Sequence, residues 1–214
     1  MSWTRQGSGP ERRGYHHGNL REALIEATLK LIAAKGPASF TIAEAARLAG
    51  VSPAAPYRHF RDAEALLAEV AVRGFEQLTE ALTRAWNNGH PDPASGFEAL
   101  GRAYLRFARE KAAYYAAMFE ANLALDVHLN VQESNDRAFG VLRDAADQLA
   151  GGLPRDRRPP ALMVALHVWT LAHGIASLFV RADASRRKLP MSAEELFEAG
   201  VLVYFQGLGL SQAK

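Results

Sequence analysis

Hydrophobic residues recur every three or four positions along most of this chain, which is the spacing of one face of an α-helix. The pattern is clear from Asn19 onward, where Asn19 is suited to an N-cap, Glu22 can complete a capping box, and Gly36-Pro37 is a stop signal. It therefore predicts an amphipathic helix between Asn19 and Gly36. Its apolar stripe consists of Leu20, Leu24, Ala27, Leu31 and Ala34.

A much shorter helix is predicted next, between Thr41 and Gly50. Thr41 is suited to cap its N-terminus, and Glu44 stands at the third helical position, where its side chain can complete a capping box. Gly50 is suited to the left-handed backbone conformation that often follows a helix. This helix should have about two turns.

The following stretch, VSPAAPYRHF at residues 51–60, contains two prolines where a third helix is expected. Ser52 can serve as its N-cap, which places Pro53 at the first helical position, where a missing N–H does no harm. Pro56 is then the fourth helical residue, and it removes about one hydrogen bond to the Ser52 carbonyl. We expect a short, strained helix that continues through Phe60.

The rest of the sequence also has a helical period. A long helix is predicted after Asp62, its cap, and the stretch NNGHPDPASG at residues 87–96 is a loop by composition. Residues 97–125 should divide into two helices near Glu110–Ala112, and further helices are expected within residues 131–152, 159–183 and 192–209. Neither a strand pattern nor an internal repeat is evident. The expected fold is all-α, with about nine helices in two regions.

Composition and charge narrow the classes of function. The 214 residues are 49% hydrophobic, which is enough for a substantial core, and none is cysteine, which excludes disulfides and thiolate metal sites. Residues 1–61 hold nine Lys/Arg and four Asp/Glu, although the whole chain has a formal net charge of only +2. A basic front end favours an anionic partner, with nucleic acid ahead of a membrane surface. Residues 1–16 are expected to form a flexible basic arm, not a secretory signal.

The first three helices have the outline of a helix-turn-helix. Ala49-Gly50-Val51 can form the tight turn, and the third helix would then read a DNA groove. Small residues at its start allow close approach to bases and phosphates, and the residues after them can donate hydrogen bonds to the DNA backbone. The candidates are Ser52, Pro53, Ala54 and Ala55, followed by Tyr57, Arg58 and His59. A helix-end aromatic pair packing on Phe60 is the alternative for Tyr57 and His59.

Residues from about Tyr15 to Leu67, in an uninterrupted order of motifs, resemble the DNA-binding domain of the TetR (tetracycline-repressor) family of bacterial regulators. The resemblance implies that Thr41, Ser52, Tyr57 and His59 contact DNA phosphates. Members commonly have a lysine at the position of Ala63, so Arg58 or Arg61 would have to replace that contact here. It also implies a helix-turn-helix domain over residues 17–62 and a helical effector-binding and dimerisation domain over residues 63–214.

Within the second domain, WTLAHGIASL at residues 169–178 resembles a tryptophan–histidine–glycine signature of one subgroup. Aromatic residues elsewhere would suit a pocket for an apolar or aromatic small molecule, although each could equally be core. The candidate ligand-binding residues are Tyr104, Phe107, Tyr115, Met118, Phe119, Trp169 and His173. His173 needs a hydrogen-bond partner, which an effector could supply. The histidines lack metal-ligand spacing, so neither a metal nor a cofactor is expected.

The apolar segment Ala161–Val180 is long enough to cross a membrane, but His167 and His173 near its middle favour a buried helix of a soluble bundle. Its small residues, with those of the last helix, are expected to form a homodimer interface, with packing inside one subunit as the alternative. These small residues are Ala165, Ala172, Gly174, Ala176 and Ser177.

The predicted function is a homodimeric, cytoplasmic DNA-binding regulator, a repressor that a small apolar or aromatic effector releases from a near-palindromic site in double-stranded DNA. A DNA-binding adaptor without sequence preference is the alternative. An enzyme in the helical domain is a more remote one, because no G-x-S-x-G, H-E-x-x-H or phosphate-binding glycine loop is present.

Overall fold

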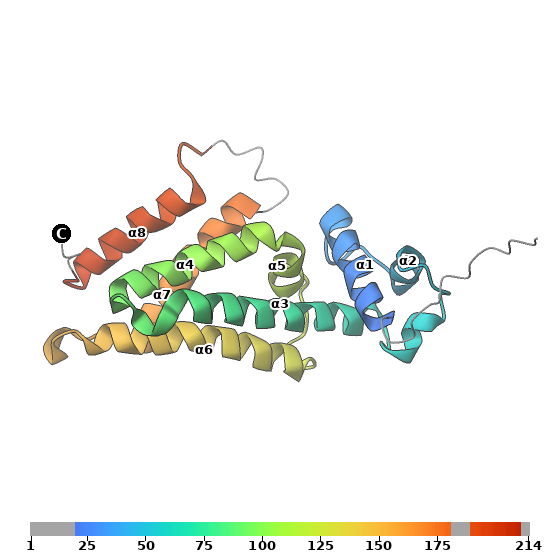
Figure 1. Cartoon of the computed structure of the whole chain (residues 1–214), viewed down its shortest axis with the longest axis horizontal. Coiled ribbons are helices and arrows are strands. Elements are labelled where there is room, and N and C mark those ends of the chain that lie inside the picture. The colour runs from blue at the N-terminus through green and yellow to red at the C-terminus, as the bar shows by residue number, and fades with distance from the viewer. Residues whose placement is uncertain (1–19, 181–188, 211–214) are drawn as a thin grey trace, which may run out of the picture.

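The structure is a computed structural model of the chain, and it describes residues 20–180 and 189–210. All regular elements in these residues are helical, which confirms the all-α class, and Figure 1 shows them as a small head beside a larger bundle. The α-helices are α1 (Leu20–Lys35), α2 (Ile42–Leu48), α3 (Ala63–Trp86), α4 (Pro93–Glu110), α5 (Ala112–Phe119), α6 (Leu129–Gly151), α7 (Ala161–Val180) and α8 (Ala193–Gly207). Three short 3-10 helices are η1 (Ala55–Arg58), η2 (Asn87–Gly89) and η3 (Arg155–Arg157).

Local signals in the sequence set most helix ends. Thr41 caps α2 in a complete capping box with Glu44, and the Asp62 side chain accepts a hydrogen bond from the Ala65 N–H at the start of α3. The predicted break between α4 and α5 is confirmed, because Lys111 lies between them with non-helical backbone angles. The predicted cap Asn19 and the arm at residues 1–16 lie outside the described residues.

Two hydrophobic clusters hold the fold together. The cluster of the head joins α1 and α2 to Phe60 and to the first turns of α3, as far as Val70. The larger cluster fills the bundle of α3, α4, α6, α7 and α8. The long helix α3 contributes to both, and Figure 1 shows it running from the head through the bundle.

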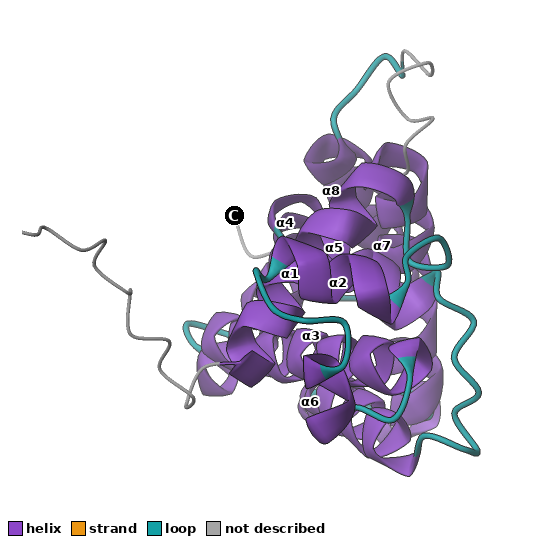
Figure 2. Cartoon of the chain, turned by 90° about the vertical axis from the view of Figure 1, so that its right-hand side faces the viewer, coloured by secondary structure: helices purple, strands orange, loops and turns teal. Residues whose placement is uncertain are grey.

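The short helix α5 is a second link between head and bundle. Ala117 is fully buried in the head cluster, whereas Phe119, two residues later, packs against the bundle cluster. In Figure 2, which looks at the molecule from the head, α5 lies behind α1 and α2. The position of the head is therefore set by packing against two helices of the bundle.

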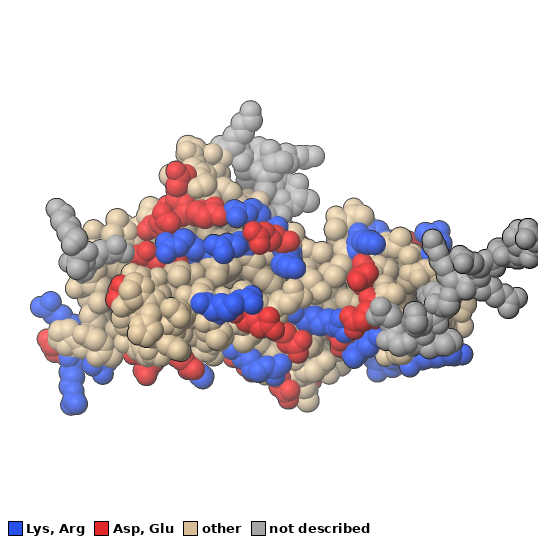
Figure 3. All heavy atoms as spheres, viewed as in Figure 1, with Lys and Arg blue, Asp and Glu red and all other residues tan. Residues whose placement is uncertain are grey.

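Two surface ion pairs connect α8 to α4. Arg109 pairs with Glu194 at 2.5 Å, and Arg102 lies 3.4 Å from Glu198. Figure 3 shows basic and acidic groups side by side over this part of the bundle. Exposed pairs of this kind contribute little energy, so the apolar packing beneath them holds α8 in place.

The membrane alternative rests on α7. Its stretch Ala161–Phe179 is long and apolar enough to cross a bilayer. A third of the most apolar part of this stretch is buried among the residues that the structure describes. Val164, Val168 and Ile175 pack into the bundle cluster. One side of α7 therefore packs in the bundle, whereas Leu162, Met163 and Leu166 are exposed.

Candidate nucleic-acid interface and effector pocket

The turn between α2 and the predicted reading helix has the conformation that the sequence indicates. Gly50 has a φ of +74°, and the Val51 N–H donates to the Ala46 carbonyl at 3.0 Å. Ala45 and Ala46 are fully buried, which lets α2 pack closely on its neighbours. A glycine is favoured here because a side chain would strain a left-handed backbone.

The reading helix differs from the prediction. It is a four-residue 3-10 helix that starts at Ala55, with Ala54 as its cap, so Ser52 is not the N-cap and Pro53 lies in the preceding turn. The Ser52 carbonyl accepts from the Ala55 N–H at 3.0 Å. The physical reason is Pro56, which has no N–H to donate to Ser52 in an α-helical turn. Such a short helix has a weak dipole, so anion binding here would rest on side chains.

The surface of this segment nevertheless brings the predicted DNA-binding residues together. Pro56 and Phe60 are buried and anchor the segment, whereas the Tyr57 side chain is 58% exposed. Because these two residues are held in the core, the candidate side chains around them face the solvent together. Ser52, Pro53, Ala54, Tyr57, Arg58 and His59 are exposed, and Ala55 is half-buried. Their contact with DNA stays a prediction.

Thr41, the remaining candidate, is exposed but already has partners. Its hydroxyl accepts from the Glu44 N–H at 3.2 Å and donates to the Glu44 carboxylate at 3.0 Å. That carboxylate also accepts from the Lys35 ammonium at 2.7 Å. A phosphate at Thr41 would therefore have to share the hydroxyl with the capping box.

Acid should lower the stability that Glu44 gives to the start of α2. The Lys35 ammonium, followed by the backbone and hydroxyl of Thr41, lowers the pKa of Glu44 from 4.5 to about 2. Because the folded-state pKa is depressed, the contribution of Glu44 to stability is complete above pH 4.5 and is lost as the pH falls toward 2. We expect wild type to be more stable than Glu44→Gln at about pH 6 and the gap to close in acid. Thermal unfolding between about pH 6 and about pH 2.5 measures this, and a gap independent of pH would contradict it.

Ion pairs between α1 and α3 orient the head, and the sequence analysis did not identify them. Arg73 of α3 pairs with Glu22 of α1 and with Glu69 at 3.0 Å, and Glu69 also pairs with Arg21 at 2.8 Å. The Arg73 side chain is only 24% exposed. Glu22 in turn lowers the free energy of the charged form of Arg73, and the pKa of Arg73 is raised by this contact. The network joins the head to the helix that continues into the bundle.

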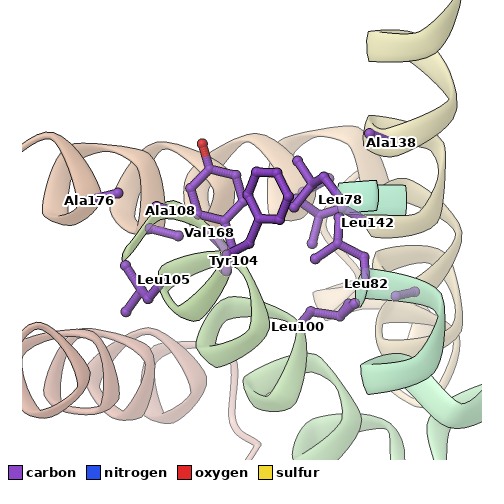
Figure 4. Close-up of a cluster of buried hydrophobic side chains, with 14 of the residues drawn as sticks. Leu78, Leu82, Leu100, Tyr104, Leu105, Ala108, Ala138, Leu142, Val168 and Ala176 are labelled. Carbon is purple, nitrogen blue, oxygen red and sulfur yellow. The ribbon is translucent and has the colours of Figure 1, made fainter. Parts of the chain in front are cut away.

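A cavity lies in the bundle, between α3, α4, α6 and α7. Its volume is about 240 Å³, and Phe119 of the short helix α5 is among its lining residues. Figure 4 shows part of its wall, where Leu78, Leu82, Leu100 and Leu142 lie to one side of Tyr104. The lining residues are Phe75, Leu78, Leu82, Leu100, Gly101, Tyr104, Phe119, Asn135, Ala138, Phe139, Leu142, Leu166, Val168, Trp169 and Ala172.

Three of the predicted ligand-binding residues line this cavity: Tyr104, Phe119 and Trp169. The other four do not. Phe107 borders a surface groove between α3 and α4, and Met118 packs against Gly74 of α3, where its sulfur occupies the place of a Cβ. Tyr115 and His173 do not line the cavity, but their rings contact the lining residue Phe119. Phe107 and Met118 instead point to other sides of α4 and α5.

His173 has its hydrogen-bond partners within the protein. Its Nδ1 lies 2.7 Å from the Tyr104 hydroxyl and 3.2 Å from the Tyr115 hydroxyl, and its ring stacks on Trp169 with a centroid distance of 5.2 Å. Burial lowers the pKa of His173, which favours the neutral ring. The protein itself thus supplies the partner that an effector could have supplied.

Three of the five small residues of α7 face the interior of the bundle. Ala165, Ala172 and Ala176 are buried inside the subunit, so the expectation that they contact a second subunit is wrong for these three. Gly174 is exposed, with open space around it, and Ser177 is half-buried beside Tyr115. The outer face instead carries large apolar residues. On α7 and α8 these are Leu162, Met163, Leu166, Leu178, Leu202 and Val203.

Several lining residues were missed by the sequence analysis. Phe75, Leu78 and Leu82 come from α3, and Asn135, Phe139 and Leu142 come from α6. The signal was present, because each set repeats every three or four residues on one helix face. The same spacing is typical of ordinary core, and it does not indicate which face borders a cavity. No group of three or more metal-ligating side chains occurs among the residues that the structure describes.

An exposed helix-turn-helix joined to a helical bundle is typical of a class of DNA-binding regulator. Comparison with known families agrees. Residues 24–70 match the bacterial regulatory proteins of the tetR family, and residues 97–204 match a tetracyclin repressor-like C-terminal domain. The chain belongs to the TetR family of transcriptional regulators.

Solved structures show the same fold. A protein of unknown function from Rhodococcus sp. RHA1 is 30% identical with a TM-score of 0.76, covering 91% of this chain and 98% of the other. The TetR family regulator PfmR from Thermus thermophilus is 22% identical with a TM-score of 0.66, covering 89% and 99%. The fatty acid degradation regulator FadR from Bacillus halodurans is 14% identical with a TM-score of 0.68, covering 94% and 99%. Comparison with curated proteins gives no match.

Proposed function

We propose that this protein is a homodimeric transcriptional repressor of the cytoplasm that binds a near-palindromic DNA site and leaves it when a small effector enters the bundle cavity. It acts by binding and not by catalysis. The observation that carries the proposal is the outward presentation of Ser52, Tyr57, Arg58 and His59 around the buried anchors Pro56 and Phe60. Donors clustered on an exposed turn after a helix-turn-helix are suited to DNA phosphates.

The exposed apolar faces of α7 and α8 support a homodimer. Leu166 is 41% exposed and Val203 is 69% exposed. The two faces adjoin, because His167 of α7 lies 3.3 Å from the Tyr204 hydroxyl of α8. Large apolar side chains gathered on one face favour association with a second protein surface. A two-fold pair would place two heads on half-sites about one helical turn of DNA, or a little more, apart.

The cavity supports effector control. Phe119 lines it, and Ala117 on the same short helix is buried in the head cluster. A ligand that displaces Phe119 would therefore move the packing surface of the head. Such a ligand shifts the protein toward a released state only as far as it binds that state more tightly.

Substitutions of the phosphate donors should lower the affinity for all DNA, whereas a substitution at Ala54 should change the sequence preference. Tyr57→Phe and His59→Ala remove phosphate donors, so we expect each to weaken binding to all duplexes by about 3-fold to 10-fold with the fold intact. Ala54→Leu places bulk where bases would approach, and it should change the order of preference among duplexes. Fluorescence anisotropy with the operator and an unrelated duplex measures both effects. Equal losses on both duplexes for Ala54→Leu would remove Ala54 from the reading surface.

The proposal can be tested with the DNA that flanks the protein's own gene. The purified protein should retard this intergenic fragment in a mobility-shift assay with excess nonspecific competitor at moderate salt. Raising the salt should weaken retention steeply, since phosphate contacts release counterions. Equal affinity for the fragment and for the competitor would instead support the adaptor alternative.

A further inference from the structure

The wall of the bundle cavity carries no formal charge. Its fifteen described lining residues include no Asp, Glu, Lys, Arg or His, and Asn135 is the one amide among them. A carboxylate or an ammonium group buried against such a wall would have no opposite charge beside it. Burial of an unpaired charge is strongly unfavourable, so the cavity selects against charged molecules.

The other polar groups near the cavity are occupied. The Tyr104 hydroxyl is bonded to His173 Nδ1 at 2.7 Å, and Figure 4 shows this hydroxyl pointing toward α7 and away from the leucines of the wall. Burial raises the pKa of the Tyr104 hydroxyl, and burial lowers the pKa of His173. Both groups therefore stay neutral near pH 7, and both have partners within the protein, because His173 Nδ1 also lies 3.2 Å from the Tyr115 hydroxyl.

Asn135 differs from them. It is half-buried on α6, it lines the cavity, and its side chain makes no hydrogen bond to any residue that the structure describes. Ala138, Phe139 and Leu142 continue the same face of α6 along the cavity, so the amide stands at one end of an apolar surface. An amide can both donate and accept, which suits a neutral hydroxyl, carbonyl or amide group of a ligand.

We infer that the cavity binds an uncharged, largely apolar molecule whose one polar group hydrogen-bonds to the Asn135 side chain, and that it rejects carboxylates of the same shape. This inference rests on the proposed function, because it treats the cavity as the effector site. Asn135 is then the residue that positions and selects the ligand, while the apolar wall supplies most of the affinity.

Two probes of matched shape test the inference: 2-naphthamide, which is neutral, and 2-naphthoate, which is an anion at pH 7. Calorimetric titration of the full-length protein should show binding of the amide at least about tenfold tighter than of the carboxylate. The variant Asn135→Leu should bind the amide about fivefold more weakly. Asn130→Leu, an exposed position at the start of the same helix, is the matched control and should bind like wild type.

Three results would overturn the inference: binding of 2-naphthoate as tight as that of the amide, unchanged amide affinity in Asn135→Leu, or binding of neither probe. Unfolding temperatures of both variants show whether a loss reflects misfolding, and Asn135→Gln, which keeps the amide, should retain the preference for the neutral probe. DNA binding is measured separately. A protein that discriminates the probes but binds no DNA specifically would contradict the proposed function alone. A protein that binds DNA specifically but does not discriminate the probes would contradict this inference alone.

Discussion

Replacing Leu202 and Val203 with glutamate is expected to turn the protein into a monomer and to abolish specific DNA binding. These side chains are 45% and 69% exposed on α8, beside the apolar face of α7. In a dimer formed through this face, each carboxylate would be buried without a partner, which costs several kcal/mol per ion. A monomer keeps one head, so we expect operator affinity to fall by at least about a hundredfold, because half of the phosphate contacts are lost.

Val127→Glu is the matched control for this prediction. Val127 is 65% exposed, close to the value for Val203, but it precedes α6 and lies outside the α7 and α8 face. The control should remain dimeric and should bind DNA like wild type. Sedimentation equilibrium gives the oligomeric state of both variants. A Leu202→Glu/Val203→Glu protein that still sediments as a dimer would place the interface elsewhere.

The change Gly101→Ala should destabilise the protein by about 3 kcal/mol, although alanine is the better helix former. Gly101 lies in α4 against α8, and a Cβ there would stand 1.8 Å from Cζ of Phe197, whose ring is fully buried. The gain in helix propensity is at most about 1 kcal/mol, so the clash decides the sign. The phenylalanine cannot move without disturbing the contact of α8 with the bundle. Chemical denaturation measures the free energy of unfolding.

Gly140→Ala provides the comparison on another helix of the bundle. No atom lies within 4 Å of the place where its Cβ would stand, so only the propensity gain should appear. The double change Gly101→Ala/Phe197→Leu should recover part of the loss, because the two side chains share one space. If Gly101→Ala proved as stable as Gly140→Ala, the tight packing of α8 on α4 would be refuted.

The head could be predicted closely because short-range chemistry determines it. The capping box of Thr41 and Glu44, the left-handed Gly50 and the cap at Asp62 all involve residues within a few positions of one another. Such signals can be read from a single sequence. The exception is the reading segment, where Pro56 was treated as the loss of one α-helical hydrogen bond, whereas the chain adopts a tighter 3-10 turn.

The candidate effector pocket could be predicted only in part, for a physical reason. Residue chemistry identified Tyr104, Phe119 and Trp169, but Phe107 and Met118 have the same apolar character and lie on other sides of their helices. Which helix faces border a cavity depends on contacts between distant segments. For the same reason the small residues of α7 were assigned to a dimer interface, although three of them pack against the bundle.

Selection from a pool of random duplexes would show whether paired heads read a specific DNA sequence. Full-length protein would be mixed with the pool at moderate salt, and the retained duplexes would be sequenced after several rounds. We expect enrichment of two inverted half-sites at a fixed spacing near one helical turn, and loss of this enrichment in the monomeric variant. Retention of duplexes with no common sequence would contradict it and would leave a protein that binds the DNA backbone alone.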